Sequence, residues 1–337
     1  MVMENTLELR PVQVPENKPP AALDSLLPPE STNRPFIQAN TIESSLAELR
    51  DKHIIPVFIK DNEPLISHSD FIHLTGEMAS EVFSGESILQ PAVRLSHAVK
   101  GRIPEAKDKP AQQLAEHEKT LYYERMAFII EIPTIHDTVD GHPLSLTIGG
   151  VKAYSMDNLA GRKGSDEHFK VFIGFQNRVC TNLCVSTDGF MNDMKVRNMG
   201  QLKACIRSLF EGFNASFALH GLRGFSDHAI REDQFAHLIG KCRMYPFLPR
   251  EMQAGIPQLL FGDTQLGSVV RDYYRDGSFC RQPDGSINLW KLYNLFTGAN
   301  KSTYIDSFLD RSVNAFQFVH SLKQALISGS NSWYLAE

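Results

Sequence analysis

Three apolar runs dominate the hydrophobic pattern of the middle of the chain: residues 126–135 (MAFIIEIPTI), 143–155 (PLSLTIGGVKAYS) and 169–185 (FKVFIGFQNRVCTNLCV). All three are rich in β-branched and aromatic residues, and turn-forming residues separate them, which is typical of strands. The first two are joined by Val139-Asp140-Gly141-His142. This connection predicts a hairpin, because Asp-Gly accepts the positive φ of a tight turn. The runs therefore predict a β-sheet core.

After Gly189 the apolar period changes to 3.6, which predicts helices. Strands followed by helices favour an α+β fold. The predicted organisation is a disordered Pro-rich arm at 1–40, a β-rich region at 41–190 and a mainly helical region at 191–337 packed on the sheet. The predicted helices lie at 41–50 (with Thr41 as N-cap), 70–83 (with Ser69 as N-cap) and 199–219, and around 235–242, 266–273, 289–296 and 313–326. An edge strand is predicted at 53–60, a strand pair or a strand plus loop at 88–104, and a flexible loop at 160–165.

The first 40 residues contain seven of the 18 prolines. Proline lacks a backbone donor and keeps its predecessor extended, so this segment predicts an unstructured or polyproline-like arm. We expect ordered structure to begin near Thr41.

Charge argues against one class of protein. The net charge is −5 and the pI is near 6.2, whereas a dedicated duplex-DNA binder is usually basic. Residues 170–281 nevertheless hold 14 Lys or Arg against 10 Asp or Glu. Either a local basic surface exists there, or the charges are scattered over solvated helix faces.

The five cysteines are odd in number and form no CxxC pair, so they give no zinc motif and fit a reducing compartment. The sequence shows no secretory signal and no apolar run long enough for a membrane span. We expect a cytoplasmic protein without a cofactor and without a membrane partner.

The first candidate site is the segment RLSHAVKGR at 94–102. A strand here would place Arg94, Lys100 and Arg102 on one face, with His97 on the other. Such a face could bind phosphates through charge-assisted hydrogen bonds. The alternative is an exposed sheet face whose cations discourage edge pairing.

The second candidate is the polar string at 176–182 inside the third apolar run. On a strand, Gln176, Arg178 and Asn182 would share a face, opposite Asn177. Arg suits bidentate anion contacts, and Asn or Gln can read amides or bases. The alternative is a structural network in which a carboxylate pairs the Arg and the amides satisfy backbone groups.

A third candidate site consists of His136, Asp137 and His142, which together could bind a metal ion. The alternative is a solvated hairpin loop.

No GxSxG elbow or phosphate-binding loop occurs, so catalytic residues stay unassigned. Five aromatic residues are either stacking platforms for single-stranded bases or core: Tyr122, Tyr123, Tyr154, Phe172 and Phe175.

Four segments carry a family resemblance: SHSDFI (67–72), GESILQPAVRLSHAVKGRIPEAK (85–107), EKTLYYERMAFIIEIPTI (118–135) and RVCTNLCV (178–185). Over about residues 50–330 the chain resembles an uncharacterised family encoded on plasmids and conjugative transposons of anaerobic gut bacteria. RVCTN and NLWKLYNLFTGANK (288–301) are also similar to a broader phage/plasmid-like family. That family has an acidic residue after its Asn-x-x-Thr, where this chain has Gly298.

The resemblance implies a mobile-element context but no reaction. The leading interpretation is therefore an accessory protein of a mobile genetic element that binds single-stranded nucleic acid, with no enzymatic activity expected. One alternative is an enzyme of unknown chemistry centred on the Arg178 string. The other is a module that binds a host or element-encoded protein. The cations offered for nucleic-acid binding are Arg94, Lys100, Arg102, Lys152 and Arg178.

Overall fold

The computed structural model describes residues 35–53, 55, 65–157, 166–329 and 332–335. Residues 1–34 of the predicted arm, most of the predicted edge strand and the loop at 160–165 lie outside these ranges. Phe36 and Ile37 are buried in a hydrophobic cluster with Phe308. Ordered structure therefore begins before Thr41, because these two apolar side chains anchor the chain.

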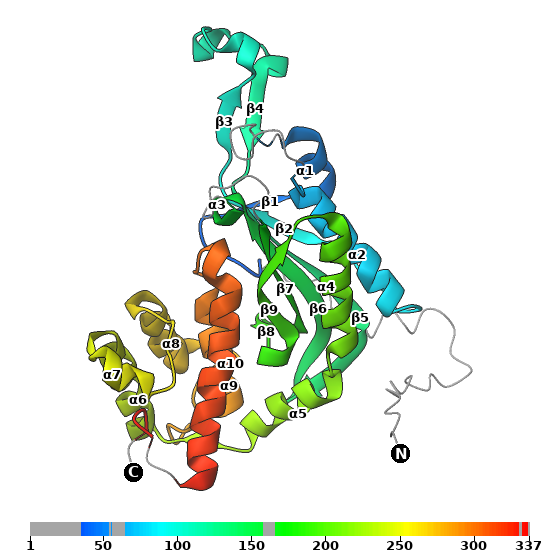
Figure 1. Cartoon of the computed structure of the whole chain (residues 1–337). Coiled ribbons are helices and arrows are strands. Elements are labelled where there is room, and N and C mark those ends of the chain that lie inside the picture. The colour runs from blue at the N-terminus through cyan, green and yellow to red at the C-terminus, as the bar shows by residue number, and fades with distance from the viewer. Residues whose placement is uncertain (1–34, 54, 56–64, 158–165, 330–331, 336–337) are drawn as a thin grey trace. The chain divides into compact units, whose positions relative to one another are not determined.

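A seven-stranded antiparallel sheet forms the centre of this part of the chain, in the order β1-β2-β5-β6-β7-β8, with β9 also paired to β7 (Figure 1). The predicted α+β fold class is confirmed, and β9 extends the sheet past the expected boundary at 190. The strands are β1 (Ile42–Ser44), β2 (Ala92–Leu95), β5 (Arg125–Val139), β6 (His142–Ala153), β7 (Glu167–Asn177), β8 (Leu183–Cys184) and β9 (Phe190–Val196).

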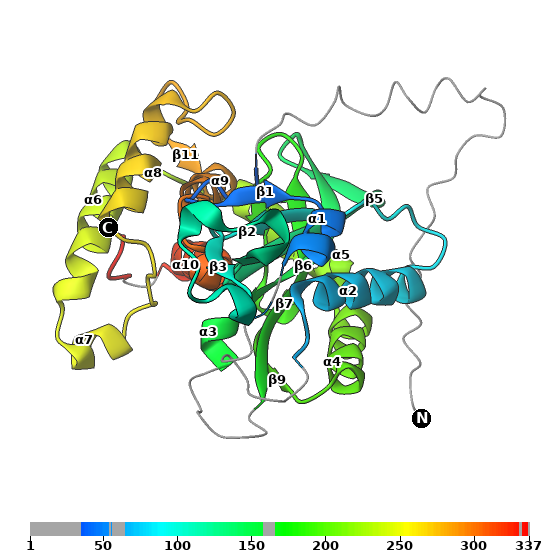
Figure 2. The ribbon, with the colours of Figure 1, turned by 90° about the horizontal axis from the view of Figure 1, so that it is seen from above.

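The sheet is covered on both faces, which explains why its strands read as nearly continuous apolar runs. Alternate side chains of β5 enter different clusters: Phe128 and Ile130 pack with Phe71, while Ala127 and Ile129 pack with Phe308. Helices α2 (His68–Val82) and α4 (Met199–Gly212) cover the first face. The N-terminal half of α10 (Ile305–Ser328) covers the second (Figure 2).

Glycine is required at two neighbouring positions of β6, one packed against α2 and the other against the backbone of β5. A Cβ on Gly150 would lie 2.5 Å from the Phe71 ring, and one on Gly149 would lie 2.1 Å from the carbonyl oxygen of Phe128. The Gly-Gly pair therefore serves close packing. As predicted, Asp140 and Gly141 turn the β5–β6 hairpin with φ of 49° and 77°. A bulge interrupts β5 between Ile132 and His136.

The predicted helices are present, but two of them begin at other residues than predicted and one is divided into two helices. Residues 42–44 form a strand before α1, whose N-cap is Ser45, and Ser67 caps α2. The expected helix at 199–219 is two helices, because Asn214 accepts a hydrogen bond from the Phe217 amide and starts α5. The remaining helices are α1 (Leu46–Lys52), α3 (Tyr154–Asp157), α5 (Ala215–Ser226), α6 (Glu232–Met244), α7 (Arg250–Ala254), α8 (Asp263–Arg275) and α9 (Leu289–Asn300).

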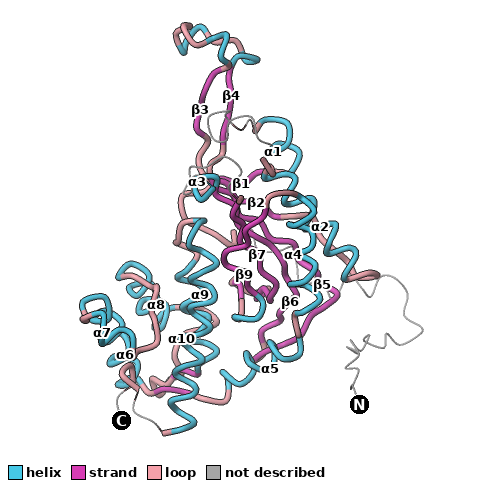
Figure 3. Tube along the Cα trace, in the orientation of Figure 1, coloured by secondary structure: helices cyan, strands magenta, loops and turns pink. Residues whose placement is uncertain are grey.

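Two short antiparallel pairs lie outside the main sheet. One joins β10 (Ala229–Ile230) to β11 (Ile287–Asn288). The other joins β3 (Val99–Arg102) to β4 (Lys119–Tyr122), and we call residues 99–122 the ribbon. Figure 3 shows the ribbon's strands extending away from the strands of the main sheet. Its tip consists of 3-10 turns at 104–106, 111–113 and 116–118.

No helix within the described ranges has both the length and the apolar character needed to cross a bilayer.

Candidate functional site: a cationic ribbon above buried polar networks

Residues 178–182 of the polar string form a turn, so the strand alternation predicted for 176–182 is wrong beyond Asn177. Strand β7 ends at Asn177, whose amide donates to the carbonyl of Asn182 at 2.9 Å. The Asn177 side chain accepts from the Val179 amide at 3.0 Å, and Thr181 adopts a φ of 59°. Asparagine side chains stabilise such turns by replacing backbone partners. The string therefore reverses the chain from β7 into β8.

Helix α9 completes this network. Asn177 donates to the side-chain oxygen of Asn294 at 3.2 Å, and Asn182 donates to the Asn294 carbonyl at 3.0 Å. Lys301 donates to the Thr181 hydroxyl at 2.8 Å and also to the Cys180 carbonyl. Asn177, Asn182 and Asn294 are at most 3% exposed. These amides satisfy one another in the interior, which matches the structural alternative for the string.

Arg178 is also engaged within the protein. Its Nε lies 3.3 Å from Oε1 of Glu131 on β5, and Ser145 of the intervening strand donates to the same carboxylate at 2.7 Å. The Arg178 side chain is 24% exposed. Gln176 is buried in β7, opposite Ser145. The Arg178 guanidinium therefore links the end of β7 to β5.

Lys152 is fully buried on β6 with two carboxylates. Its Nζ lies 2.9 Å from Glu167 and 3.1 Å from Asp157, and 3.9 Å above the Phe169 ring. Glu167 also accepts the Ile66 amide at 3.1 Å. A buried lysine cannot contact a phosphate backbone from this position. The group ties β6, α3, β7 and the start of α2 together.

Arg94 and His97 lie apart from the other predicted cations. Arg94 donates to the Thr41 hydroxyl and lies 3.7 Å from Glu43, so it links β2 to β1. The exposed His97 lies 2.6 Å from Asn40. The predicted common face of Arg94, Lys100 and Arg102 is wrong, because the chain leaves the main sheet after Leu95 and β3 belongs to another sheet.

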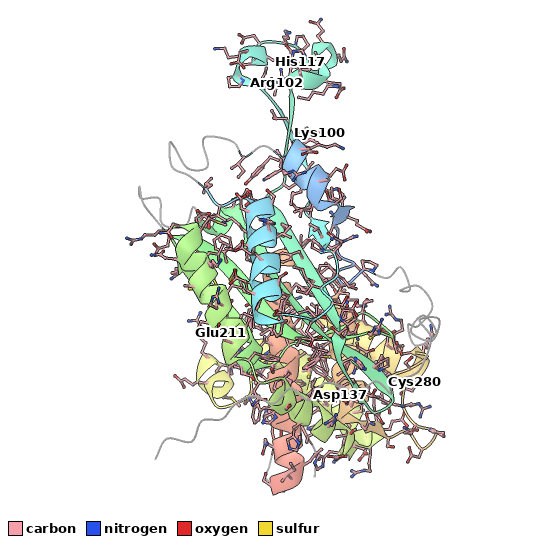
Figure 4. All side chains as sticks on the ribbon, turned by 90° about the vertical axis from the view of Figure 1, so that its right-hand side faces the viewer. Lys100, Arg102, His117, Asp137, Glu211 and Cys280 are labelled. Atoms are coloured by element: carbon pink, nitrogen blue, oxygen red, sulfur yellow. The ribbon has the colours of Figure 1, made fainter. Side chains whose placement is uncertain are left out.

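Lys100 and Arg102 are exposed on the ribbon, whose register shows which residues share a face. Arg102 lies opposite Lys119, and Lys100 lies opposite Leu121. Directly opposed residues of an antiparallel pair point to the same side, as do residues two apart on one strand. Lys100, Arg102 and Lys119 therefore form one cationic face, which we call the ribbon face. Figure 4 shows Lys100 and Arg102 on the ribbon, with His117 at its tip.

Local contacts leave this face open. The Lys100 side chain has no hydrogen bond or ion pair to any residue that the structure describes. Lys119 pairs at 2.5 Å with Glu116, whose side chain is 90% exposed, and such pairs break at little cost. Arg102 donates to the carbonyls of Lys107 and Lys109, which holds the tip against the ribbon without neutralising the guanidinium.

The three metal candidates do not converge. His136 lies 3.2 Å from the Pro133 carbonyl, Asp137 pairs with Arg223, and His142 accepts from the Trp290 indole at 3.2 Å. Groups of three His, Cys, Asp or Glu residues able to hold a metal are absent from the described ranges. The five aromatic candidates for base stacking are all buried: Tyr122, Tyr123, Tyr154, Phe172 and Phe175.

No pattern in the sequence points to the cluster of rings at the base of the ribbon. His53 and His68 stack 5.1 Å apart, and Tyr154 lies 4.4 Å from His68. The His53 Nδ1 accepts from the Tyr123 amide at 3.2 Å, and burial lowers the pKa of His53 to about 4. Burial also lowers the pKa of His68, whose Nε2 lies 2.9 Å from the Tyr123 carbonyl. These neutral imidazoles hold the backbone at Tyr123, where the chain leaves the ribbon after β4.

The chain belongs to a family that is defined by a domain of unknown function. The model of the family described as "Domain of unknown function, B. Theta Gene description (DUF3871)" matches residues 27–335. No curated protein and no solved structure matches the chain.

Proposed function

We propose that the protein binds nucleic acid through the ribbon face, as an accessory protein of a mobile genetic element. The observation that carries the proposal is the exposure of Lys100, Arg102 and Lys119 on one side of a two-stranded ribbon. The other predicted cations, Arg94, Lys152 and Arg178, lie beside carboxylates and have side chains that are at most 24% exposed, so they are much less accessible to phosphates. Resemblance to plasmid- and transposon-encoded families supports the mobile-element context.

The cationic side chains of the ribbon face indicate which chemical groups of a ligand it would bind. Lys and Arg bind phosphate oxygens by charge-assisted hydrogen bonds, which position a nucleic acid without reading its sequence. Base stacking on the five aromatic candidates is excluded by their burial. The proposal therefore rests on phosphate contacts, which single strands and duplexes both offer. A two-stranded ribbon also has the dimensions to enter the major groove of a duplex.

Fluorescence anisotropy with a labelled 20-nucleotide single strand, and with its duplex, tests the proposal. We expect binding at low salt that weakens linearly on a log–log plot. Three phosphate contacts to a single strand predict a slope of roughly −2. The double variant Lys100→Glu with Arg102→Glu should lose at least tenfold in affinity for the preferred form.

A matched control is available at the C-terminal end of β9. Lys195 and Arg197 are also two residues apart and have side chains that are 51% and 69% exposed. Reversing both changes the net charge by the same amount as the ribbon variant. Equal weakening by the two variants would show a non-specific charge effect and reject the ribbon. Absence of binding at low salt would reject nucleic acid and leave the enzyme and protein-partner alternatives.

A further inference from the structure

An exposed apolar knuckle lies between α6 and α7, far along the chain from the ribbon. Three of its side chains are exposed although they are apolar: Met244 at 54%, Phe247 at 86% and Met252 at 51%. Phe247 closes a 3-10 turn at Tyr245–Phe247, between the end of α6 and α7. We call residues 244–252 the knuckle. Aromatic and Met side chains are enriched at protein interfaces, so this exposure indicates a contact surface.

Buried and hydrogen-bonded residues hold the knuckle in its conformation. Tyr245 is buried, with its ring 6.3 Å from that of Tyr334. The Gln253 side-chain amide donates to the Tyr245 carbonyl at 3.2 Å and to the Leu248 carbonyl at 2.9 Å. Pro246 and Pro249 restrict the backbone on either side of Phe247. A preformed turn loses little conformational entropy on binding, so Phe247 is suited to act as an anchor.

The charges of the knuckle are self-complementary. Arg250 and Glu251 are exposed neighbours on α7, and neither forms an ion pair with any part of the chain that the structure describes. Nearby cations are engaged, since Arg243 pairs with Asp263 at 3.0 Å and Lys241 lies 4.7 Å above the Trp333 ring. The two available charges are therefore of opposite sign and adjoin the exposed apolar side chains.

We propose that the knuckle binds the knuckle of a second copy of this chain, forming a two-fold homodimer. In a two-fold contact, a residue that touches its neighbour's counterpart is touched by it in return. Arg250 of each copy then pairs with Glu251 of the other, and the two Phe247 side chains are buried at the centre. This assignment rests on the knuckle alone and is independent of nucleic-acid binding.

Sedimentation-velocity analysis of the full chain over a wide concentration range tests the dimer. The wild-type protein should shift from monomer to dimer as concentration rises. Phe247→Ala should weaken dimerisation by about ten- to hundredfold, as expected for losing a buried aromatic contact. Phe217→Ala is the matched control, because Phe217 is also an exposed phenylalanine, at 68%, but lies on α5. It should dimerise like wild type.

The charge pair gives a second, independent test. Arg250→Glu places like charges opposite each other and should weaken the dimer, as should Glu251→Arg. The double variant exchanges the two charges and should restore dimerisation, since complementarity returns. A wild-type protein that stays monomeric throughout overturns the proposal, and so does equal dimerisation of the Phe247 and Phe217 variants. Failure of the double variant to recover also rejects the two-fold pairing and points to a different partner surface.

Discussion

Arg178 reaches from the end of β7 across β6 to Glu131 on β5, with 3.3 Å between Nε and Oε1. The two side chains are 24% and 21% exposed, and Ser145 of β6 donates to the same carboxylate. One ion pair thus joins three strands at one end of the sheet. The sequence suggested that Arg178 binds an anion, and in the structure this anion is the Glu131 carboxylate of the same chain.

We predict that Arg178→Ala lowers the free energy of unfolding by about 1–3 kcal/mol, the range for losing a hydrogen bond to a charged group. Urea denaturation of Arg178→Ala, Glu131→Gln and the double variant measures the coupling between the two residues. The double variant should cost less than the sum of the single changes. Strict additivity would show that the pair does not contribute to stability.

Substitution of Lys152 should lower the free energy of unfolding more than substitution of Arg178. Lys152→Met keeps most of the side-chain volume but leaves the carboxylates of Asp157 and Glu167 buried without their cation. We expect a loss of about 3–5 kcal/mol, measured by urea denaturation near neutral pH. Lys195→Met is the comparison, because its pair with Asp193 is half exposed and should be worth at most about 1 kcal/mol. Similar losses in the two variants would contradict the assigned role of Lys152.

The ring cluster at the ribbon base predicts a pH dependence of stability. Burial lowers the pKa of His53 to about 4, below the value of about 6.5 in an unfolded chain. The unfolded chain therefore binds a proton first as pH falls, and stability is lost between about pH 6.5 and pH 4. His68 adds to the same trend, because burial lowers its pKa too.

Urea midpoints measured at several pH values for wild type and His53→Gln isolate this effect. Wild type should lose more stability than the variant between pH 7 and pH 4. Carboxylates also respond to acid, but they do so in both proteins, so the difference reports His53. Parallel curves for the two proteins would show that His53 is not held neutral by the fold.

Local patterns predicted the strands, the hairpin at Asp140-Gly141 and most helices, because each depends on neighbouring residues. They also aligned Lys100 with Arg102, which follows from strand alternation alone. Arg94 was placed with them wrongly, since the sequence does not show that the chain changes sheets between Leu95 and Val99. The partner of Asn177 could not be predicted either, because Asn294 lies 117 residues away. Which cations are buried is decided by such long-range contacts.

Asn294 offers the sharpest test of the network around the RVCTN turn. Its side chain accepts from Asn177 and donates to the Trp290 carbonyl at 3.0 Å, and it is 1% exposed. Asn294→Leu has similar volume but leaves the buried Asn177 amide without that partner, so we expect a loss of about 1–3 kcal/mol in urea denaturation. Asn294→Asp keeps the acceptor oxygen and should still satisfy Asn177, although its charge is costly to bury. Hydrogen exchange should then show faster exchange at the Val179 and Thr181 amides in Asn294→Leu, because the turn loses its anchor on α9. Unchanged exchange at both amides, together with wild-type stability, would show that the turn holds its shape without Asn294.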